Sequence, residues 1–356
     1  MAITSVSFAP CIQRQEDPNW RFALAAYPTV EGWLVSIRED DGAIGHGYAQ
    51  SLPHIGSTYH GVKAALDLLG PLLVGMEATS IAAIMTNLDR ALVGNEHAKA
   101  GIDCALHDLV AQHCGVPLYD LFGGKTTNSV PQIRIVPIKT PEEMAGNAVA
   151  LVEKGYRYLK IKVHGDVVED VARVSAIRHR VGPETRLTID ANQAYTPKAA
   201  IAALRRMEEF DIDLVEQPVR ANDLAGLELV TRSVTVAVEA DESAQSLRDV
   251  LFLVSNRIVD AISLKIPKMG GLRNVFAAAR ICEAGDIRYR MGAIFGPRIH
   301  AAQALHLSAA LPGLDYACEL AEFDHLLDDP FDGLEVDNGD LYLSDAVGSG
   351  VFLRDN

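Results

Sequence analysis

The sequence predicts an α/β protein in which a modified (β/α)8 TIM-type barrel is joined to an α+β capping domain. The main observation is a series of charged residues, each at the end of a short apolar segment: Lys162, Asp190, Glu216, Asp241 and Lys265. They are separated by 28, 26, 25 and 24 residues, about the length of one strand, one helix and two loops. In a (β/α)8 barrel the carboxyl ends of the strands surround one opening, where active sites lie. We therefore expect these five side chains to face one another across that opening.

Length and composition support this fold and exclude several classes of protein. With 356 residues, 49% of them hydrophobic, the chain can form a barrel of roughly 250 residues and a second domain. The net charge of −15 argues against binding to nucleic acid or to an anionic membrane. Five scattered cysteines without CxxC spacing predict neither a disulfide framework nor a zinc site. No segment approaches about 18 consecutive apolar residues, and no signal peptide is evident, so we expect a cytoplasmic protein.

Residues 1–125 are expected to form the capping domain, which residues 320–356 return to complete. Its first part consists of three alternating segments that predict antiparallel strands, at 3–14, 32–40 and 42–50. The Asp41-Gly42 pair predicts a hairpin turn. Helical spacing of apolar residues follows between about 59 and 114. The aromatic-rich loop at 17–30 either packs on a neighbouring domain or covers a ligand.

The barrel is expected to occupy residues 126–319. Its first strand is predicted at 130–138, followed by a helix that begins at Thr140 with Pro141 in its first turn. The other predicted strands are 158–163, 186–190, 212–216, 236–241, 260–265, 289–294 and 314–319. Helices are predicted between them at 167–180, 197–208, 222–231, 246–254, 271–283 and 299–310.

Three carboxylates on consecutive strand ends, Asp190, Glu216 and Asp241, predict a metal site. Any one of them alone could be a solvated rim residue. Together their repulsion would destabilise the fold unless a cation lay between them. Oxygen ligands without His or Cys favour Mg²⁺, or Mn²⁺, over zinc. Asn192 and Glu242 follow these strand ends and could orient the ligands.

Lysines occur on both sides of this row of carboxylates. Lys160 and Lys162 lie two residues apart on one strand, so both point into the barrel. Beside a divalent cation we expect their pKa to be lowered, which suits an amine for work as a base. Lys162 is the predicted base and Lys160 its electrostatic partner, whereas Lys265, four strands further on, faces Lys162. Lys268 is expected at the solvated rim, with substrate binding as the alternative.

Two amines on opposite sides of a metal-bound carboxylate suit chemistry at the α carbon. One amine removes the α proton, the metal stabilises the resulting enediolate, and the other amine acts on the opposite face. The predicted partner is therefore a small carboxylate.

The motifs that carry these residues resemble those of the enolase superfamily, in particular its mandelate racemase/muconate lactonizing enzyme subgroup. They are KIK at 160–162, DAN at 190–192, EQP at 216–218, ADES at 240–243 and LKIPKMGG at 264–271. Residues 1–125 and the C-terminal tail also resemble that group's capping domain. The resemblance implies that Asp190, Glu216 and Asp241 bind Mg²⁺, and that Lys162 and Lys265 are the acid/base pair. It further implies a role for Glu319 at the end of the eighth strand and a homo-oligomer, from dimer to octamer.

One segment departs from the subgroup. Where many members have Glu-Ser followed by glycine after the seventh strand, this chain has Gly296-Pro297. Arg298 could bind an anionic group of the substrate, and His300 is expected within the following helix. This difference leaves the identity of the substrate open.

The expected reaction is racemisation or epimerisation of an amino-acid derivative, because both lysines needed for two-base proton transfer are present. A muconate-type cycloisomerase and a dehydratase of a hydroxylated acid, such as a hydroxyproline, need the same metal and lysines. A barrel that uses a Schiff-base lysine, or a non-catalytic carboxylate-binding scaffold, explains the three carboxylates less well.

Overall fold

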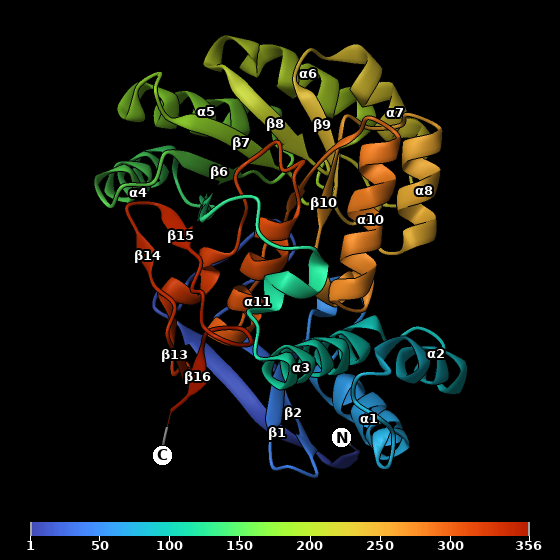
Figure 1. The fold of residues 1–356 in the computed structure, drawn as a ribbon. Helices are drawn as coiled ribbons and strands as arrows, with labels where there is room; N and C mark the ends of the chain where they lie inside the picture. Colours follow the sequence, from blue (N-terminus) through green and yellow to red (C-terminus); the bar gives the residue numbers. More distant parts are fainter. Residues whose placement is uncertain (1, 355–356) are drawn as a thin grey trace.

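Two sheets organise the structure, an antiparallel sheet built mainly from the N-terminal strands and a curved parallel sheet surrounded by helices (Figure 1). The computed structural model describes residues 2–354. The strands are β1 (Ile3–Gln15), β2 (Thr29–Glu39), β3 (Ile44–Gln50), β4 (Ser129–Pro131), β5 (Ile133–Val136), β6 (Tyr158–Lys162), β7 (Arg186–Asp190), β8 (Ile212–Glu216), β9 (Ala237–Ala240), β10 (Ala261–Leu264), β11 (Arg288–Met291), β12 (Leu326–Leu327), β13 (Phe331–Asp332), β14 (Val336–Asp337), β15 (Asp340–Tyr342) and β16 (Phe352–Leu353). The helices are α1 (Tyr59–Leu69), α2 (Ile81–Ala91), α3 (Glu96–Cys114), α4 (Pro141–Glu153), α5 (Val167–Val181), α6 (Pro197–Met207), α7 (Leu224–Ser233), α8 (Leu247–Ser255), α9 (Ile266–Met269), α10 (Leu272–Ala284) and α11 (Arg298–Ala310).

The N-terminal sheet has the strand order β12-β1-β2-β3. The predicted hairpin between β2 and β3 is present, and Gly42 supplies the positive φ of 95° that its turn requires. Helix α3 packs directly on β3, because a side chain at Gly45 or Gly47 would lie within 2.2 Å of the α3 backbone. The other side of α3 contacts α9 and α10, so this helix is buried on almost all sides and joins the sheet to the barrel.

The parallel sheet has the order β11-β10-β9-β8-β7-β6-β5, which is the strand arrangement of a (β/α)8 barrel read from its seventh strand to its first. Apolar side chains on its outer face, such as Ile161, Ile189 and Val215, are fully buried beneath the surrounding helices. The helix expected at Thr140 begins with a capping box in which Thr140 and Glu143 bond to each other's backbone N–H groups. Side chains alternate between the two faces of a strand. Since the apolar residues of these strands face outwards, the charged residues between them point into the barrel.

The barrel closes differently from the prediction at its first and last strands. Residues 314–319 form single bridges, Tyr289 with Leu314 and Gln132 with Cys318, and not a regular eighth strand. The backbone N–H of Cys318 donates to Pro131, and its carbonyl accepts from Ile133. The predicted strand 130–138 is divided into β4, which pairs with β15 of the tail, and β5, which pairs with β6 of the barrel.

The C-terminal tail contacts both sheets. Strand β12 pairs with the end of β1, whereas β14 and β15 form a hairpin that pairs with β4 beside the barrel. Asn338 and Gly339 both have positive φ, as the predicted two-residue turn requires. The domain boundaries near residues 125 and 319 remain predictions. Within residues 2–354, none of the helices combines the length and hydrophobicity needed to span a membrane.

Candidate active site

The structure brings the five predicted strand-end residues together at one opening of the barrel. Lys162, Asp190 and Glu216 are the last residues of β6, β7 and β8, and they are paired in register across these strands. Asp241 and Lys265 directly follow β9 and β10. The three carboxylates are at most 4% exposed. Three strands, β7, β8 and β9, lie between those of Lys162 and Lys265, so the two lysines flank the row of carboxylates.

Lysine ammonium groups neutralise this row. Lys160 Nζ lies 2.9 Å from Asp190, 2.6 Å from Glu216 and 2.6 Å from Glu319. Lys162 Nζ also lies 2.5 Å from Asp190.

At the other end of the row, Lys265 and Lys268 bond to separate oxygens of Asp241, at 2.5 and 2.6 Å. Lys268 is buried by this contact, so the prediction that it lies at a solvated rim is wrong.

The carboxylates shift the pKa of their lysine partners. Burial lowers the pKa of Lys160, but Asp190, Glu216 and Glu319 outweigh it and raise this pKa well above its usual range. The pKa of Lys265 is raised in the same way by Asp241 and Glu216. This is opposite to the lowering expected beside a divalent cation, because in the protein alone the carboxylates are the nearest charges. Burial does lower the pKa of Lys268.

The donor set fits a hard divalent cation. Glu216 uses Oε2 for Lys160 and Arg290, while its Oε1 is buried without a hydrogen-bond partner among the described residues. An unpaired buried carboxylate oxygen is costly unless a cation takes it. Asp190 and Asp241 end or follow the neighbouring strands, and their oxygens are bonded to lysines. Oxygen ligands alone suit Mg²⁺ or Mn²⁺.

Three residues after the strand ends support the carboxylates. Asn192 accepts from Lys162 at 3.0 Å and donates to Glu242 at 3.3 Å. Burial and the charge of Asp241 raise the pKa of Glu242 to about 7. The Oε1 atom of Gln217 accepts the backbone N–H groups of Asp241 and Ser243. Gln217 belongs to the EQP motif, but no pattern in the sequence indicated this contact.

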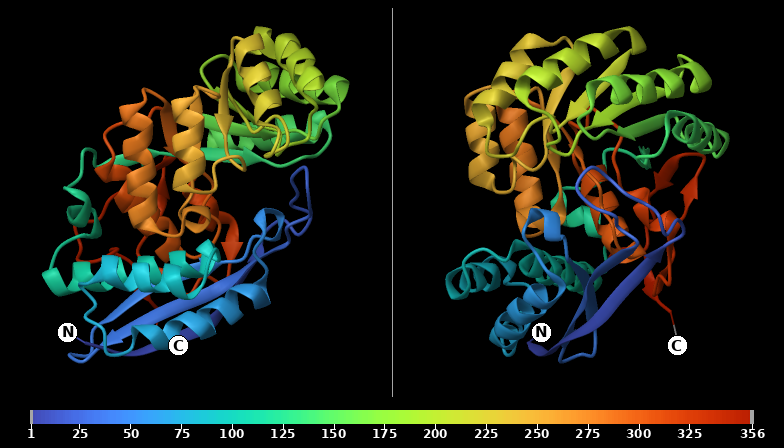
Figure 2. Two further views of the ribbon diagram at one scale, coloured as in Figure 1. Left: turned by 90° about the vertical axis from the view of Figure 1, so that its right-hand side faces the viewer. Right: turned by 180° about the vertical axis from the view of Figure 1, so that it is seen from behind.

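An enclosed cavity of about 40 Å³ lies above the lysines. Lys162, Lys265 and Lys268 line it from the barrel, and Trp20, Phe22, Tyr27 and Phe295 cover it. The aromatic rings pack on one another with centroids 5.5–6.3 Å apart. Of the two expectations for the 17–30 loop, packing on the neighbouring domain is confirmed, because Trp20 and Phe22 form one buried cluster with Ile135 and Phe295 of the barrel. The same rings line the cavity, and Figure 2 shows the N-terminal sheet extending towards the barrel at this end.

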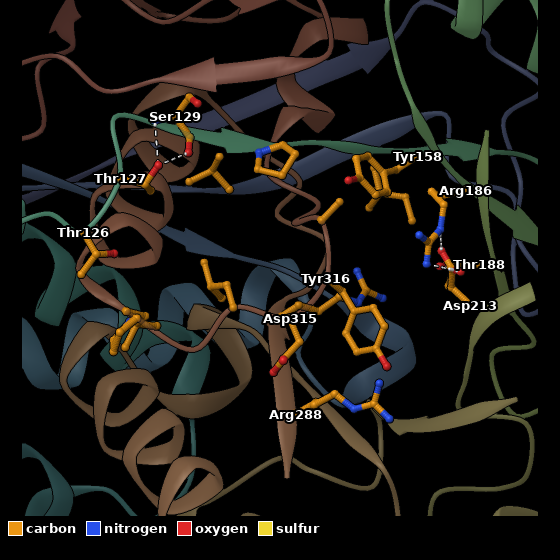
Figure 3. A pocket seen from close by; sticks show the side chains of 18 residues that line it. Thr126, Thr127, Ser129, Tyr158, Arg186, Thr188, Asp213, Arg288, Asp315 and Tyr316 are labelled. Carbon is orange, nitrogen blue, oxygen red and sulfur yellow. Dashed lines mark hydrogen bonds and ion pairs between the residues drawn. The ribbon is translucent and has the colours of Figure 1, made fainter. Parts of the chain in front are cut away.

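A larger cavity of about 660 Å³ lies at the opposite end of the barrel (Figure 3). It is lined by residues that begin the strands, including Tyr158, Arg186 and Arg288. Arg186 is paired with Asp213, and Arg288 stacks on Tyr316. The amino-terminal end of a barrel serves stability more often than chemistry. The enclosed cavity, with the lysines and carboxylates, is therefore the candidate active site.

Two predicted residues lie elsewhere. Arg298 begins α11 and donates to Asp329 and to the carbonyl of Leu334, so the structure does not bring it into the enclosed cavity. His300 lies in α11 as expected and packs against Tyr48. The interior contains two charged residues that the sequence reasoning missed, Arg290 and Glu239. Both are inward-facing residues of short strands, and the two-residue alternation used for Lys160 and Lys162 would have found them.

Comparison with known proteins identifies the family. Residues 143–356 match the family described as enolase C-terminal domain-like, and residues 12–123 match the mandelate racemase/muconate lactonizing enzyme N-terminal domain. The L-Ala-D/L-Glu epimerase of Clostridium acetobutylicum is 35% identical over 93% of this chain and 94% of its own length. A chloromuconate cycloisomerase of Cupriavidus necator is 33% identical over 86% and 84%. The solved structure of an Enterococcus faecalis dipeptide epimerase, complexed with Mg and L-Leu-L-Tyr, superimposes with a TM-score of 0.95 at 33% identity and 99% coverage of both chains. The chain therefore belongs to the mandelate racemase/muconate lactonizing enzyme subgroup of the enolase superfamily, as its motifs predicted.

Proposed function

We propose that this enzyme is a Mg²⁺-dependent racemase or epimerase of an amino-acid derivative, with Lys162 and Lys265 as its two acid/base residues. The observation that carries the proposal is the placement of one lysine at each end of the row Asp190, Glu216 and Asp241. A substrate carboxylate bound at this row presents its α carbon between the two Nζ atoms. Proton removal on one face and delivery on the other inverts that carbon.

Each residue of the site has a role in this proposal. Asp190, Glu216 and Asp241 hold Mg²⁺, which supplies positive charge to stabilise the enediolate form of the substrate. One lysine begins the reaction neutral and accepts the α proton at Nζ, while the other begins protonated and donates. Lys160 keeps its proton between Asp190, Glu216 and Glu319. Lys268 Nζ fixes Asp241 by donating to both the backbone carbonyl and the carboxylate of Asp241.

The cavity supports a particular form of substrate. Its cover consists of Trp20, Phe22, Tyr27 and Phe295, which suit an apolar side chain. Its only carboxylates are those of Asp241 and Glu242, and Asp241 is already bound to two lysines. If the substrate carried a free α-ammonium group, the carboxylates available to pair with it among the described lining residues would be Asp241 and Glu242. An amide nitrogen on the reacting carbon, as in an N-acylated amino acid, matches this lining better.

Binding requires the cover to move. A cavity of about 40 Å³ has room for only two or three water molecules, by the rule that one water needs about 10–15 Å³. Closure over the substrate excludes bulk water, which strengthens the electrostatic interactions that favour proton removal.

Proton NMR in D₂O tests the proposal directly. The Mg²⁺-loaded enzyme is incubated with N-acylated amino acids, dipeptides, proline derivatives, hydroxyprolines and muconates. Deuterium at Cα together with the opposite stereoisomer is the expected result, strongest for N-acylated apolar amino acids. Exchange without inversion in every substrate contradicts the two-base proposal.

Cycloisomerisation is the second candidate, because a chloromuconate cycloisomerase is among the similar proteins and uses the same type of fold. A lactone signal from a muconate in the same experiment would favour it. A vinylic signal from a hydroxyproline would instead favour a dehydratase.

A further inference from the structure

We propose that Arg290 is a positioning residue for the metal site, acting together with Glu239. It fixes the carboxylate of Glu216 so that Oε1 is the oxygen presented to the metal. This inference rests on the metal-ligand role proposed above for Glu216. Neither Arg290 nor Glu239 lines the enclosed cavity, so any effect on the site passes through Glu216 and Glu319.

The guanidinium of Arg290 contacts three buried carboxylates at once. Its Nε and Nη2 donate to Glu239 at 2.8–3.2 Å, Nη2 also donates to Glu216 Oε2 at 2.5 Å, and Nη1 donates to Glu319 Oε1 at 2.9 Å. Arg290 is 1% exposed, and its three partners are fully buried. The guanidinium of arginine has five N–H donors in one rigid plane, so it holds the three carboxylates in fixed positions relative to one another.

The strand sequence makes this reach possible. Ser263 on β10 is directly beside Arg290 on β11, and β9, with Glu239, is the next strand. The serine is small and its hydroxyl has no hydrogen-bond partner in the described part of the chain. The guanidinium can therefore pass over β10 to reach Glu239 and Glu216.

The contact determines how Glu216 is oriented. Lys160 and Arg290 both hold Oε2, which leaves Oε1 without a hydrogen bond and 3.9 Å from Lys265 Nζ. Glu319 is fixed by the same two cations through its Oε1. Residues that hold a metal ligand in place commonly change metal affinity by about 10–100-fold when they are replaced.

The alternative is that Arg290 and Glu239 only stabilise the fold. A variant that keeps the net charge distinguishes this structural role from a positioning role. Arg290 and Glu239 carry opposite charges, so replacing both by methionine leaves the net charge of the barrel unchanged. Such apolar replacement of a buried ion pair is often neutral for stability. A change in metal affinity in this double variant therefore reports the lost hydrogen bonds to Glu216 and Glu319, and not a change in net charge.

The experiment measures Mn²⁺ binding by electron paramagnetic resonance in the absence of substrate, together with the melting temperature. Wild-type enzyme is compared with E239M/R290M. The matched control is R134M/E322M, which removes another buried Arg-Glu pair, 2.8 Å apart, without a contact to the metal row. We expect E239M/R290M to remain folded and to bind Mn²⁺ about 10-fold more weakly or worse. The control should change the affinity by less than about twofold.

Wild-type Mn²⁺ affinity in a folded E239M/R290M variant would overturn the inference. If that variant does not fold, R290K provides the test, because lysine keeps the charge but lacks the planar arrangement of donors by which Arg290 holds Glu216, Glu239 and Glu319. Weaker Mn²⁺ binding by R290K supports positioning, and unchanged binding overturns it. Failure of wild-type enzyme to bind Mn²⁺ would instead overturn the proposed metal site itself, whereas failure of racemisation alone leaves this result standing.

Discussion

The side chain of Gln217 holds the backbone of Asp241: its Oε1 accepts the Asp241 N–H at 2.9 Å, and its Nε2 donates to the hydroxyl of Ser243 at 2.8 Å. Gln217 has a φ of 37°, in the left-handed region that residues with a Cβ rarely adopt. Such local strain is tolerated where surrounding contacts fix the residue. The ends of β8 and β9, which carry or precede the proposed metal ligands Glu216 and Asp241, are thereby linked.

Replacing Gln217 by alanine should weaken metal binding as well as stability. The substitution leaves two buried N–H groups unpaired, each of which costs about 1–3 kcal/mol. Calorimetric titration with Mg²⁺ and thermal melting measure the two effects. Gln193→Ala is the matched control, since Gln193 accepts one backbone N–H at 2.9 Å without contacting the ligand carboxylates. Equal Mg²⁺ affinity in both variants would contradict a positioning role for Gln217.

Substitution of either flanking lysine should abolish turnover and leave metal binding intact. Lys162→Ala and Lys265→Ala each remove one of the two proton carriers, which contribute about 10²–10⁴-fold each. Removing the lysine ammonium group beside Asp190 or Asp241 should not weaken metal binding, because it removes a positive charge that repels the metal. Activity and Mn²⁺ affinity are measured in parallel, with Lys63→Ala on the exposed face of α1 as the control. Full activity in either lysine variant would be incompatible with two-base catalysis.

Mg²⁺ should stabilise the folded enzyme. The orphan Oε1 of Glu216 gains a partner when the cation binds, and a ligand at 100 times its Kd stabilises a protein by about 2.7 kcal/mol. We expect EDTA to abolish activity and to lower the melting temperature by several degrees, and excess Mg²⁺ to restore both. In Glu216→Gln the Mg²⁺-dependent shift should disappear. A shift of wild-type size in that variant would exclude Glu216 as a ligand.

Burial of His300 should make the protein less stable in mild acid. Burial lowers the pKa of His300 from 6.5 to about 3, and both ring nitrogens lack partners among the described residues. The unfolded chain takes up a proton as the pH falls below 6.5, whereas the folded chain does not. The stability is therefore complete above 6.5 and declines as the pH falls towards 3.

His300→Phe should reduce the slope of melting temperature against pH between about 5 and 6.5. The slope is compared with that of His60→Phe, a change at an exposed histidine. Part of the pH dependence should remain in His300→Phe. Three other histidines also have pKa values lowered to about 4: His54, His97 and His306. Identical slopes in the two variants would show that His300 takes no part.

Local patterns predicted most of the fold and the first contacts of the site. Strand-end charges identified Lys162, Asp190, Glu216, Asp241 and Lys265, because the parallel arrangement converts sequence spacing into a shared opening. The network around Arg290 was missed because its three partners come from β8, β9 and the segment 314–319, and only the curvature of the sheet brings them together.

The errors at the ends of the barrel have a related cause. The first strand divides where its partner changes from β15 of the tail to β6 of the barrel, and residues 314–319 pair by single bridges to two distant neighbours. Arg298 was misplaced because its position depends on Asp329, whose location only the folded tail determines.

The bridges at residues 314–319 also bear on how the enzyme folds. They join this segment to Gln132, which precedes it by more than 180 residues, through a few backbone hydrogen bonds. Contacts between distant parts of a chain form late in folding. Closing the long loop between them loses conformational entropy before the contacts contribute any stabilising free energy. We therefore expect the amides of Ile133 and Cys318 to be the last in the barrel to gain protection from hydrogen exchange during refolding. Because Glu319 follows this segment directly, the contacts of Lys160 and Arg290 with it would form only as the ring closes, and activity would appear with that final step.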